Sequence, residues 1–232
     1  MLQRDFTNKV NWILDNIIPP VIRDSRLLMW PLFWMLFKDK THWFMQFKEK
    51  CCAFGPEEMT FYYKLLADVH LQRETDLNTL SLVRILDSVV GNKVLDIACG
   101  RGYVARRVHE KTGVEVTGID INLPEELKED SGIRFQEGRI EEIGFPDKYF
   151  DTVICAHTLE HVRELERAIS ELRRVTKRRL IVIVPRQREY QYTFDLHLHF
   201  FPYPYSLKNA MKNDLASVTV LGNDLFYVED YP

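Results

Sequence analysis

The chain has 232 residues, of which 46% are hydrophobic and 28% charged, and its formal net charge is −3. This length fits one α/β domain with an extension, and the charge gives no sign of a nucleic-acid-binding protein. The four cysteines show neither zinc-ligand nor secretory spacing, and we find no signal peptide, so we expect a cytoplasmic protein. A basic cluster at residues 173–179 fits the solvated C-terminal end of a helix.

Residues 1–45 contain all four tryptophans and an apolar run, Leu27–Phe37, which we expect Pro31 to interrupt. The run is too short to span a bilayer. Trp30 and Trp34 would share one helical face, and lysines follow the run directly. We expect residues 1–45 to cover the acceptor pocket as a lid. A homodimer contact and peripheral contact with a membrane surface are the alternatives.

Two further helices are predicted before residue 90. One covers Pro56–Leu71, and the other begins at a cap on Thr75 or Asp76. The apolar stripe of the second helix is Leu77, Leu80, Val83, Leu86 and Val89. Gly91-Asn92 ends this helix, so we divide the chain into a helical region, residues 1–89, and a second domain, residues 90–232.

The second domain opens with Lys93–Gly102, which predicts a strand, a tight turn and the start of a helix. Val94, Leu95 and Ile97 form the short apolar run of a buried parallel strand. Gly100 and Gly102 allow a tight turn and a close approach to a ligand. A helix over Tyr103–Thr112 completes a nucleotide-type site.

The remaining chain alternates between strands and helices, as a parallel sheet with helices on both faces requires. We predict helices at Pro124–Glu129, Arg163–Thr176 and Ser206–Lys212. The predicted strands are Glu115–Ile119, Ile133–Gln136, Thr152–Ala156 and Leu180–Val184, with a closing hairpin of Val218–Leu221 and Leu225–Val228.

The glycine turn leaves open which nucleotide binds. Gly100-x-Gly102-x-x-Ala105 fits the dinucleotide fingerprint, and Asp120 lies about twenty residues on. Asp96 argues against a pyrophosphate, because two like charges 4 Å apart repel by about 4 kcal/mol at an effective dielectric near 20. A ligand that carries an ammonium group would be attracted instead.

Three stretches together carry a family resemblance: Val94–Gly102, Val116–Asp120, and Phe145–Asp151 running into Leu159–Val162. In order and spacing they resemble the class I S-adenosylmethionine (SAM)-dependent methyltransferases, in particular the small-molecule enzymes of the ubiquinone-biosynthesis-like group. The resemblance covers about residues 90–185. It implies an α/β, Rossmann-like, mostly parallel seven-stranded sheet with an N-terminal helical extension, and SAM as the cofactor.

The resemblance also implies a set of cofactor-binding residues. Asp96 and the glycine loop would hold the methionine part of SAM, and Asp120 the ribose hydroxyls. Arg73, just ahead of the Thr75-Asp76 cap, is our own candidate for the SAM carboxylate. The segment Gly138-Arg139-Ile140 departs from the Gly-Asp-Ala common in the family. Because an arginine cannot accept the adenine amino proton, the backbone of this segment and Glu141 would have to bind adenine. The cofactor candidates are Arg73, Asp96, Ala98, Gly100, Gly102, Asp120, Ile121, Arg139, Ile140, Glu141, Ala156 and His157.

His157, Glu160 and His161 follow the fourth strand and would share one face if this turn were helical. The stretch resembles ubiquinone-type O-methyltransferases, which have Glu-x-x-Glu-His here and use a divalent metal. The first Glu is His157 in this chain, and metal-free relatives also carry Leu-Glu-His-Val, so we assign no metal ligand.

A second histidine group lies between the fifth strand and the last helix. If residues 190–201 are extended, Asp195, His197 and His199 share one side and could supply a general base. Alternatively, these histidines bond to the backbone of their own loop. The catalytic candidates are His157, His161, Asp195, His197 and His199, and the substrate candidates are Tyr62, Tyr63, Tyr190 and Tyr192.

We therefore expect a SAM-dependent methyltransferase that acts on a small-molecule acceptor, with a hydroxyl oxygen as the favoured site of methylation. A lipid-linked or sugar hydroxyl suits the apolar N-terminal region, and a phenol or an amine stays open as the acceptor. Two alternatives are a nicotinamide-dependent oxidoreductase and a non-catalytic SAM-fold subunit that supports a partner protein.

Overall fold

The computed structural model describes residues 12–13, 16–55, 57–59, 61–62, 75–127, 132–192 and 194–232. The chain forms two compact units. Residues 1–73 with 187–200 form one, called here the helical unit, and residues 74–186 with 201–232 form the other, the sheet unit. Residues 75–88, which the sequence grouped with the helical region, thus belong to the sheet unit.

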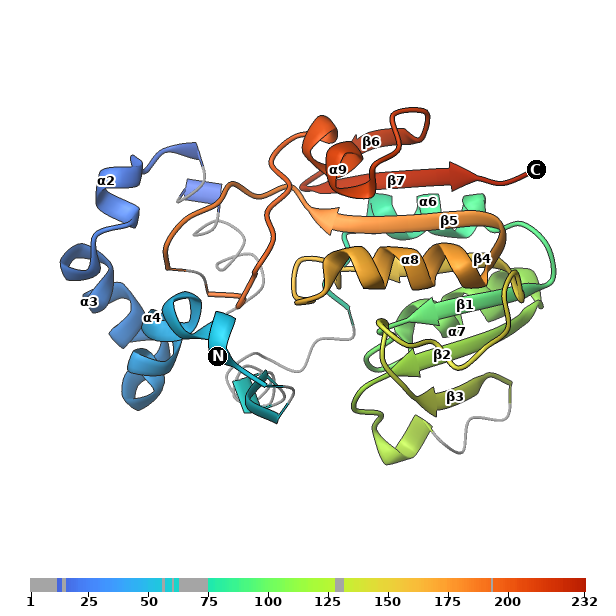
Figure 1. The fold of residues 1–232 in the computed structure, drawn as a ribbon, viewed down its shortest axis with the longest axis horizontal. Coiled ribbons are helices and arrows are strands. Elements are labelled where there is room, and N and C mark those ends of the chain that lie inside the picture. The colour runs from blue at the N-terminus through green and yellow to red at the C-terminus, as the bar shows by residue number, and fades with distance from the viewer. Residues whose placement is uncertain are drawn as a thin grey trace. The chain divides into compact units, whose positions relative to one another are not determined.

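The sheet unit contains a seven-stranded, mostly parallel sheet in the order β3-β2-β1-β4-β5-β7-β6 (Figure 1), which confirms the predicted fold class. The strands from β3 to β5 pair in parallel, whereas β7 runs antiparallel to both β5 and β6. The strands are β1 (Lys93–Ile97), β2 (Glu115–Asp120), β3 (Arg134–Glu137), β4 (Phe150–Ala156), β5 (Thr176–Pro185), β6 (Ser217–Leu221) and β7 (Asp224–Asp230).

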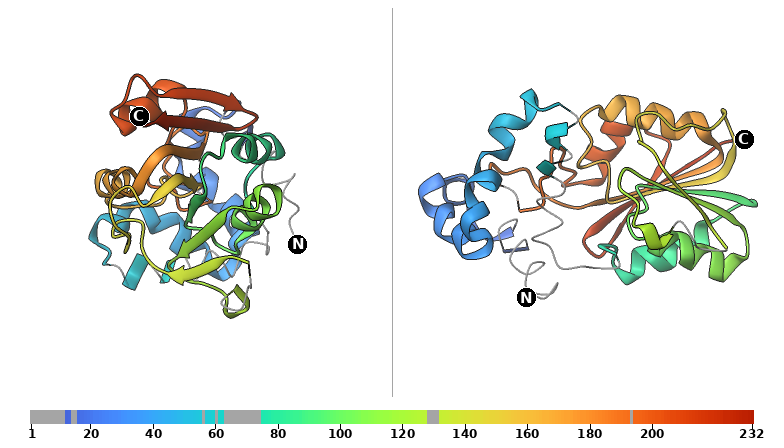
Figure 2. Two further views of the ribbon diagram at one scale, coloured as in Figure 1. Left: turned by 90° about the vertical axis from the view of Figure 1, so that its right-hand side faces the viewer. Right: turned by 90° about the horizontal axis from the view of Figure 1, so that it is seen from below.

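Helices cover both faces of this sheet (Figure 2). The helices α6 (Thr79–Ser88) and α7 (Tyr103–Thr112) pack on one face, and α8 (Leu165–Val175) and α9 (Pro204–Met211) on the other. The interior strand β5 is buried on both sides: Leu180 and Val182 lie in the cluster that contains α8, whereas Ile181 lies in the cluster that contains α6 and α7. Burial of each such aliphatic side chain stabilises the fold by about 1.5–3 kcal/mol, and the continuous apolar runs that predicted the strands reflect this burial.

The beginning and the buried face of α6 differ from the prediction. The helix begins at Thr79, and Asn78 rather than Thr75 or Asp76 caps it by accepting the Ser81 N–H at 2.9 Å. The predicted apolar stripe holds only in part. Leu77 is buried, and Leu86 and Val89 pack against the core. Leu80 and Val83 are 60% and 49% exposed, and the buried positions within the helix are Ser81, Ile85 and Ser88. Of a second expected helix, near Pro124–Glu129, the described residues form the 3₁₀ turn η3 (Glu125–Leu127), and residues 128–129 lie outside them.

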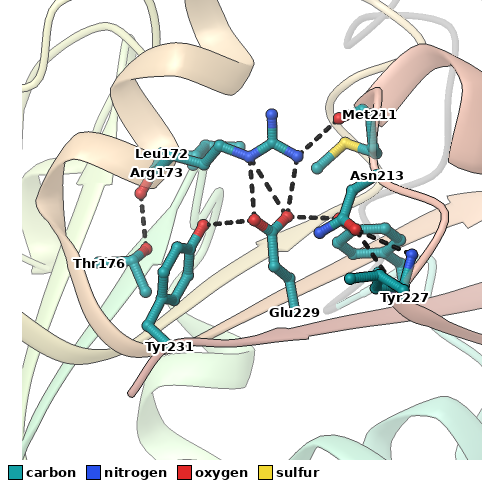
Figure 3. A network of polar contacts seen from close by, with 10 residues as sticks. Leu172, Arg173, Thr176, Met211, Asn213, Tyr227, Glu229 and Tyr231 are labelled. Atoms are coloured by element: carbon teal, nitrogen blue, oxygen red, sulfur yellow. Dashed lines mark hydrogen bonds and ion pairs between the residues drawn. The ribbon is translucent and has the colours of Figure 1, made fainter.

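A partly buried ion pair ties α8 to β7 and to the end of α9 (Figure 3). Arg173 donates to Glu229 at 2.9 Å and to the carbonyl oxygen of Met211 at 2.6 Å, while Tyr227 and Tyr231 also donate to Glu229. The other cations of the basic cluster lie within 4.0 Å of carboxylates of the same unit. The cluster therefore holds the ends of α8 and β5 in place.

The helical unit is built around an aromatic core. The helices with bounds among its described residues are α2 (Pro20–Arg23), α3 (Arg26–Phe37), η1 (Lys38–Lys40), α4 (Thr41–Lys50) and η2 (Cys51–Ala53). Phe37 stacks on Phe44 with ring centroids 3.9 Å apart, and Phe33 stacks on Phe194 at 4.6 Å. Within the described residues, no helix has the length and apolar character that crossing a bilayer requires. The predicted helix over residues 56–71 lies mostly outside the described residues.

Pro31 does not interrupt α3, which runs through it. A proline inside a helix leaves the carbonyl group four residues earlier without its partner, here that of Leu27. Leu27 is 83% exposed, so water can solvate that carbonyl group. The lid predicted for residues 1–45 stays a prediction.

Candidate active site

The glycine turn after β1 has the geometry of a ligand-binding loop. Ala98, Gly100 and Gly102 have φ values of +57°, +54° and +71°. A side chain at Gly102 would bring its Cβ to 2.6 Å from the ring of Phe135, so only glycine fits there. At Gly100, by contrast, a Cβ would meet no atom within 4 Å. The loop is therefore packed on one side and open on the other.

Asp120 lies at the end of β2, beside this loop. Its Oδ2 accepts the Gly100 N–H at 2.8 Å and its Oδ1 accepts the Asn122 N–H at 3.0 Å. Burial raises the pKa of Asp120, although these backbone hydrogen bonds lower it. Each carboxylate oxygen keeps a further lone pair, so Asp120 can accept hydrogen bonds from the two hydroxyls of a ribose. The next residue, Ile121, is 46% exposed and offers an apolar surface.

Asp96 lies behind the loop rather than on its surface. It is 2% exposed, and its Oδ2 accepts the N–H of Ala105 in the first turn of α7 at 3.0 Å. Burial raises the pKa of Asp96 to about 7, against the lowering effect of the Ala105 hydrogen bond, and the charge of Asp120 raises it further. A cationic ligand nearby would favour the ionised form. Asp96 thus fixes the start of α7 and provides negative potential under the loop.

The segment expected to contact adenine lies next to Asp120. The Gly138 N–H donates to the Asp120 carbonyl oxygen at 3.0 Å, which holds the segment against the end of β2. The half-exposed side chain of Arg139 pairs with Glu141 at 3.6 Å. Ile140 is buried. Within the segment, the Arg139 carbonyl oxygen accepts the Glu142 N–H at 3.2 Å, which forms a short bridge beside Asp120.

A buried polar group follows β4, beginning after Ala156. Residues 157–161 form a turn and not a helix, so the condition for a shared helical face is not met. The turn nevertheless brings His157 and His161 close to Glu160. His157 takes a φ of +50°, and its Nε2 lies 3.2 Å from Oδ1 of Asp224. Its Nδ1 lies 3.9 Å from Oε1 of Glu160, a side chain that is 1% exposed.

Two members of this group, Glu160 and Asp224, were not among the predicted site residues. Asp224 begins β7, and it reaches His157 because β7 pairs with β5. Glu160 belongs to a recognised motif, but only its burial in the folded chain distinguishes it from a surface residue. The i, i+3 spacing of His157 and Glu160 is compatible with their contact, but no spacing in a single sequence indicates the contact with Asp224.

Comparison with known proteins identifies this arrangement. Residues 95–184 match the family model described as a methyltransferase domain. These residues hold the glycine loop, Asp120, the adenine segment and the turn after β4, which are the features that the resemblance to class I enzymes implied. The chain contains a class I SAM-dependent methyltransferase domain.

Individual relatives of this methyltransferase domain differ in the atom that they methylate. A sterol 24-C-methyltransferase of Gibberella zeae is 36% identical over 96 residues, which are 38% of this chain and 25% of that protein. A ubiquinone biosynthesis O-methyltransferase of Alkalilimnicola ehrlichii is 30% identical over 113 residues, 44% of this chain and 45% of that protein. The chain thus spans less than half of these relatives. A crystal structure of a SAM-dependent methyltransferase from Archaeoglobus fulgidus has the same fold, with a TM-score of 0.53, 21% identity, and coverage of 65% of this chain and 91% of the other.

SAM is the cofactor of this family, and the methyltransferase domain has suitable groups for it. The open side of the loop at Gly100 leaves space for a ligand, and Asp120 beside it accepts hydrogen bonds. Asp96 supplies the negative potential that favours a cation and disfavours a pyrophosphate. Because residues 95–184 match a methyltransferase domain, we assign this site to SAM and not to the nicotinamide cofactor of an oxidoreductase.

The remaining candidates belong to the helical unit. His197 is buried, and its Nδ1 lies 2.5 Å from Oε1 of Gln187, whose Nε2 donates to the Tyr190 hydroxyl at 2.7 Å. The turn around Leu196 has a positive φ of 54°, so this stretch lacks the extended alternation that was predicted. Asp195 and His199 are half-buried. Tyr62 and Tyr192 are packed in the aromatic core, while Tyr63 and Arg73 lie outside the described residues.

Proposed function

We propose that this protein transfers the methyl group of SAM to a hydroxyl oxygen of a small-molecule acceptor. The observation that supports this most directly is the loop that is open at Gly100, next to the Asp120 carboxylate. The match of residues 95–184 to the methyltransferase family supports the reaction class. The choice of oxygen rests on the buried acid–base group after β4, because a hydroxyl must lose a proton when it is methylated.

Each part of the site has a role in this proposal. SAM supplies a methyl group that is already activated on a positively charged sulfur. Asp120 holds the ribose, Asp96 attracts the ammonium group, and the backbone of residues 139–140 with Glu141 binds adenine. Arg73 is our candidate for the carboxylate. The domain mainly has to align the acceptor and take up one proton.

We also propose that the helical unit contacts a membrane surface, so that the acceptor is apolar or lipid-linked. The observation that supports this is the outer side of α3, where Leu27, Trp30 and Trp34 are 83%, 37% and 60% exposed. Leaving such surface in water costs about 25 cal/mol per Å². Tyr62, Tyr63, Tyr190 and Tyr192 remain candidates for acceptor contact, and a second copy of the chain is the alternative cover for α3.

Calorimetric titration of the full chain with SAM and with NADH tests the cofactor assignment. We expect SAM to bind and NADH not to bind. We expect Asp120→Asn to weaken SAM binding about ten- to a hundredfold, because one charge-assisted contact contributes about 1.5–3 kcal/mol. Asp87→Asn is the matched control, since Asp87 is an exposed aspartate that pairs with Lys111 on the surface. Unchanged affinity in Asp120→Asn would contradict the assignment.

Transfer of tritium from methyl-labelled SAM to hydroxyl-bearing lipids tests the reaction itself. Labelled product that carries the methyl group on oxygen is the expected result. Tight SAM binding without transfer to any acceptor would instead favour the non-catalytic subunit.

A further inference from the structure

Glu160 is a buried carboxylate with no hydrogen-bond partner among the described residues. It is 1% exposed, and neither Oε1 nor Oε2 accepts a hydrogen bond there. Buried polar groups are nearly always hydrogen-bonded, and an unsatisfied one costs about 1–3 kcal/mol, or more if charged. A carboxylate kept at this cost, at the C-terminal edge of a parallel sheet, suggests a ligand that brings a proton donor.

The imidazole of His157, which lies next to Glu160, is held in place by Asp224. His157 directs Nδ1 toward Glu160 at 3.9 Å and Nε2 toward Asp224 at 3.2 Å. Asp224 in turn accepts from Asn78 Nδ2 and from Ser81 Oγ, both at 2.7 Å. Because Asn78 also caps α6, the imidazole is anchored through Asp224 to the start of a helix. The strained φ of His157 is consistent with a residue whose orientation is functional.

The charges around His157 and Glu160 decide which of these two side chains can act as a base. Burial alone would lower the pKa of His157, but the hydrogen bond and charge of Asp224 outweigh it and raise the pKa to about 9. The imidazole is then protonated at neutral pH and has no lone pair with which to accept a proton. For Glu160, burial raises the pKa to about 7, whereas the charge of His157 lowers it. A carboxylate that titrates near neutral pH is suited to general-base catalysis.

Other titratable groups also face Glu160. The charges of Asp224 at the start of β7 and of Asp76 before α6 both raise its pKa. Cys155 on β4 is buried, and its own pKa is raised by burial and by the charge of Glu160, so it stays a neutral thiol. A ring nitrogen of His161 lies within 4.8 Å of a Glu160 carboxylate oxygen. Among the groups whose effect on Glu160 is resolved, His157 is the side chain that lowers its pKa.

We infer that Glu160 is the base that takes the hydroxyl proton of the acceptor, and that the His157–Asp224 pair positions it and keeps it ionised. This inference rests on the proposed function. In the transfer step, the acceptor oxygen forms a bond to the methyl carbon as the carbon–sulfur bond breaks. The electron pair of that bond returns to sulfur, which becomes a neutral thioether, and the hydroxyl proton passes to Glu160, which becomes a neutral carboxylic acid. His157 and Asp224 are positioning residues in this scheme.

Carbon-13 NMR titration of the side-chain carboxyl groups, in the SAM-loaded full chain, tests the inference without an acceptor. The Glu160 signal is identified by its absence in Glu160→Gln. We expect it to titrate near pH 7 and to move to higher pH in His157→Gln, because the positive charge that favours its ionised form is lost. A Glu160 that titrates at the ordinary value of about 4.3 overturns the inference. So does a titration that does not move in His157→Gln.

The rate of methyl transfer to 4-nonylphenol, from tritiated SAM, tests the catalytic role. We expect Glu160→Gln to lower kcat at least a hundredfold with SAM affinity changed less than twofold, and Glu160→Asp to restore part of the rate. In His157→Gln, the acid limb of the profile of kcat against pH should move to higher pH. Glu166→Gln is the matched control, because Glu166 is an exposed glutamate on α8. A full rate in Glu160→Gln contradicts the inference, whereas no transfer by the unmodified chain counts against the proposed function and leaves the carboxyl titration to decide.

Discussion

At the scale of single residues, Asp96 combines a structural contact with an electrostatic one. It caps the first turn of α7 through the Ala105 N–H, and its burial raises its pKa to about 7. A carboxyl group with a raised pKa binds its proton more tightly in the folded than in the unfolded chain. The free energy of unfolding should therefore fall as the pH rises from about 4 to about 7, by roughly 4 kcal/mol at most, since one pKa unit corresponds to about 1.4 kcal/mol.

We predict that Asp96→Asn removes this pH dependence and weakens SAM binding. The asparagine oxygen can still accept the Ala105 N–H, so the cap is kept while the charge is lost. Denaturant unfolding at pH 4.5 and pH 8 should show that the variant gains stability relative to the unmodified chain at the higher pH. Calorimetry should show about tenfold weaker SAM binding. If the free energy of unfolding depends on pH equally in the two proteins, the stability prediction is wrong. If SAM affinity is unchanged in Asp96→Asn, the role of Asp96 is limited to its hydrogen bond with the Ala105 N–H.

Residues of the cofactor site could be predicted because they follow one another along the chain in a fixed order. Gly100, Gly102 and Asp120 belong to consecutive strand–turn units, and parallel strands bring their ends to one edge. The pairing of His157 with Asp224 could not be predicted in this way. Its partners are 67 residues apart, and the contact depends on where β7 inserts into the sheet.

At the scale of elements, α8 is held to the sheet by polar contacts at its C-terminal end. Glu229 on β7 is 8% exposed and accepts from Arg173, Tyr227 and Tyr231. Burial would raise the pKa of Glu229, but these donors outweigh it, so the pKa is lowered. The pair therefore stabilises the fold above the unfolded-state pKa of glutamate, and this contribution is lost as the pH falls through the lower folded-state value.

We predict that Glu229→Gln lowers the free energy of unfolding by about 1–3 kcal/mol at pH 7, because Arg173 then keeps no carboxylate partner on β7. The difference between variant and unmodified chain should shrink as the pH falls below the unfolded-state pKa of glutamate, about 4.3, and should vanish once Glu229 is protonated in the folded chain at its lowered pKa. Urea unfolding at several pH values measures both effects. Lys212→Gln, which removes an exposed charge opposite Glu166, should change stability by less than about 0.5 kcal/mol. If the difference in the free energy of unfolding is the same at every pH, the ion pair between Arg173 and Glu229 is not its cause.

The sequence predicted strands better than helix faces, for a physical reason. A strand buried on both sides is an uninterrupted apolar run, and each of the five parallel strands overlaps its predicted range. In α6, Leu80 and Val83 at helical spacing point to solvent, while Ser81, Ile85 and Ser88 are buried. Ser81 is buried because its hydroxyl donates to Asp224, a contact that hydrophobicity cannot indicate.

At the scale of the whole molecule, the two units carry different kinds of surface. The sheet unit holds the cofactor groups, whereas the helical unit exposes apolar side chains on consecutive helices. On α3, Met29, Phe33 and Phe37 are buried in the core of the helical unit, so they do not contribute to the exposed side. Exposed tryptophans followed by Lys38 and Lys40 are typical of a segment that lies at the boundary of lipid headgroups.

We predict that the full chain floats with vesicles of phosphatidylcholine and phosphatidylglycerol in a 3:1 ratio, and that Trp30→Ser/Trp34→Ser floats much less. The two indoles would bury apolar surface among the headgroups, and the nearby lysines would be attracted to the anionic lipid, so added salt should weaken binding in part. Leu80→Ser/Tyr205→Ser is the matched control, because it removes two side chains of the sheet unit that are 60% and 61% exposed. If the unmodified chain stays with the soluble fraction and sediments as a dimer that the tryptophan variant cannot form, a second copy of the chain covers α3 instead.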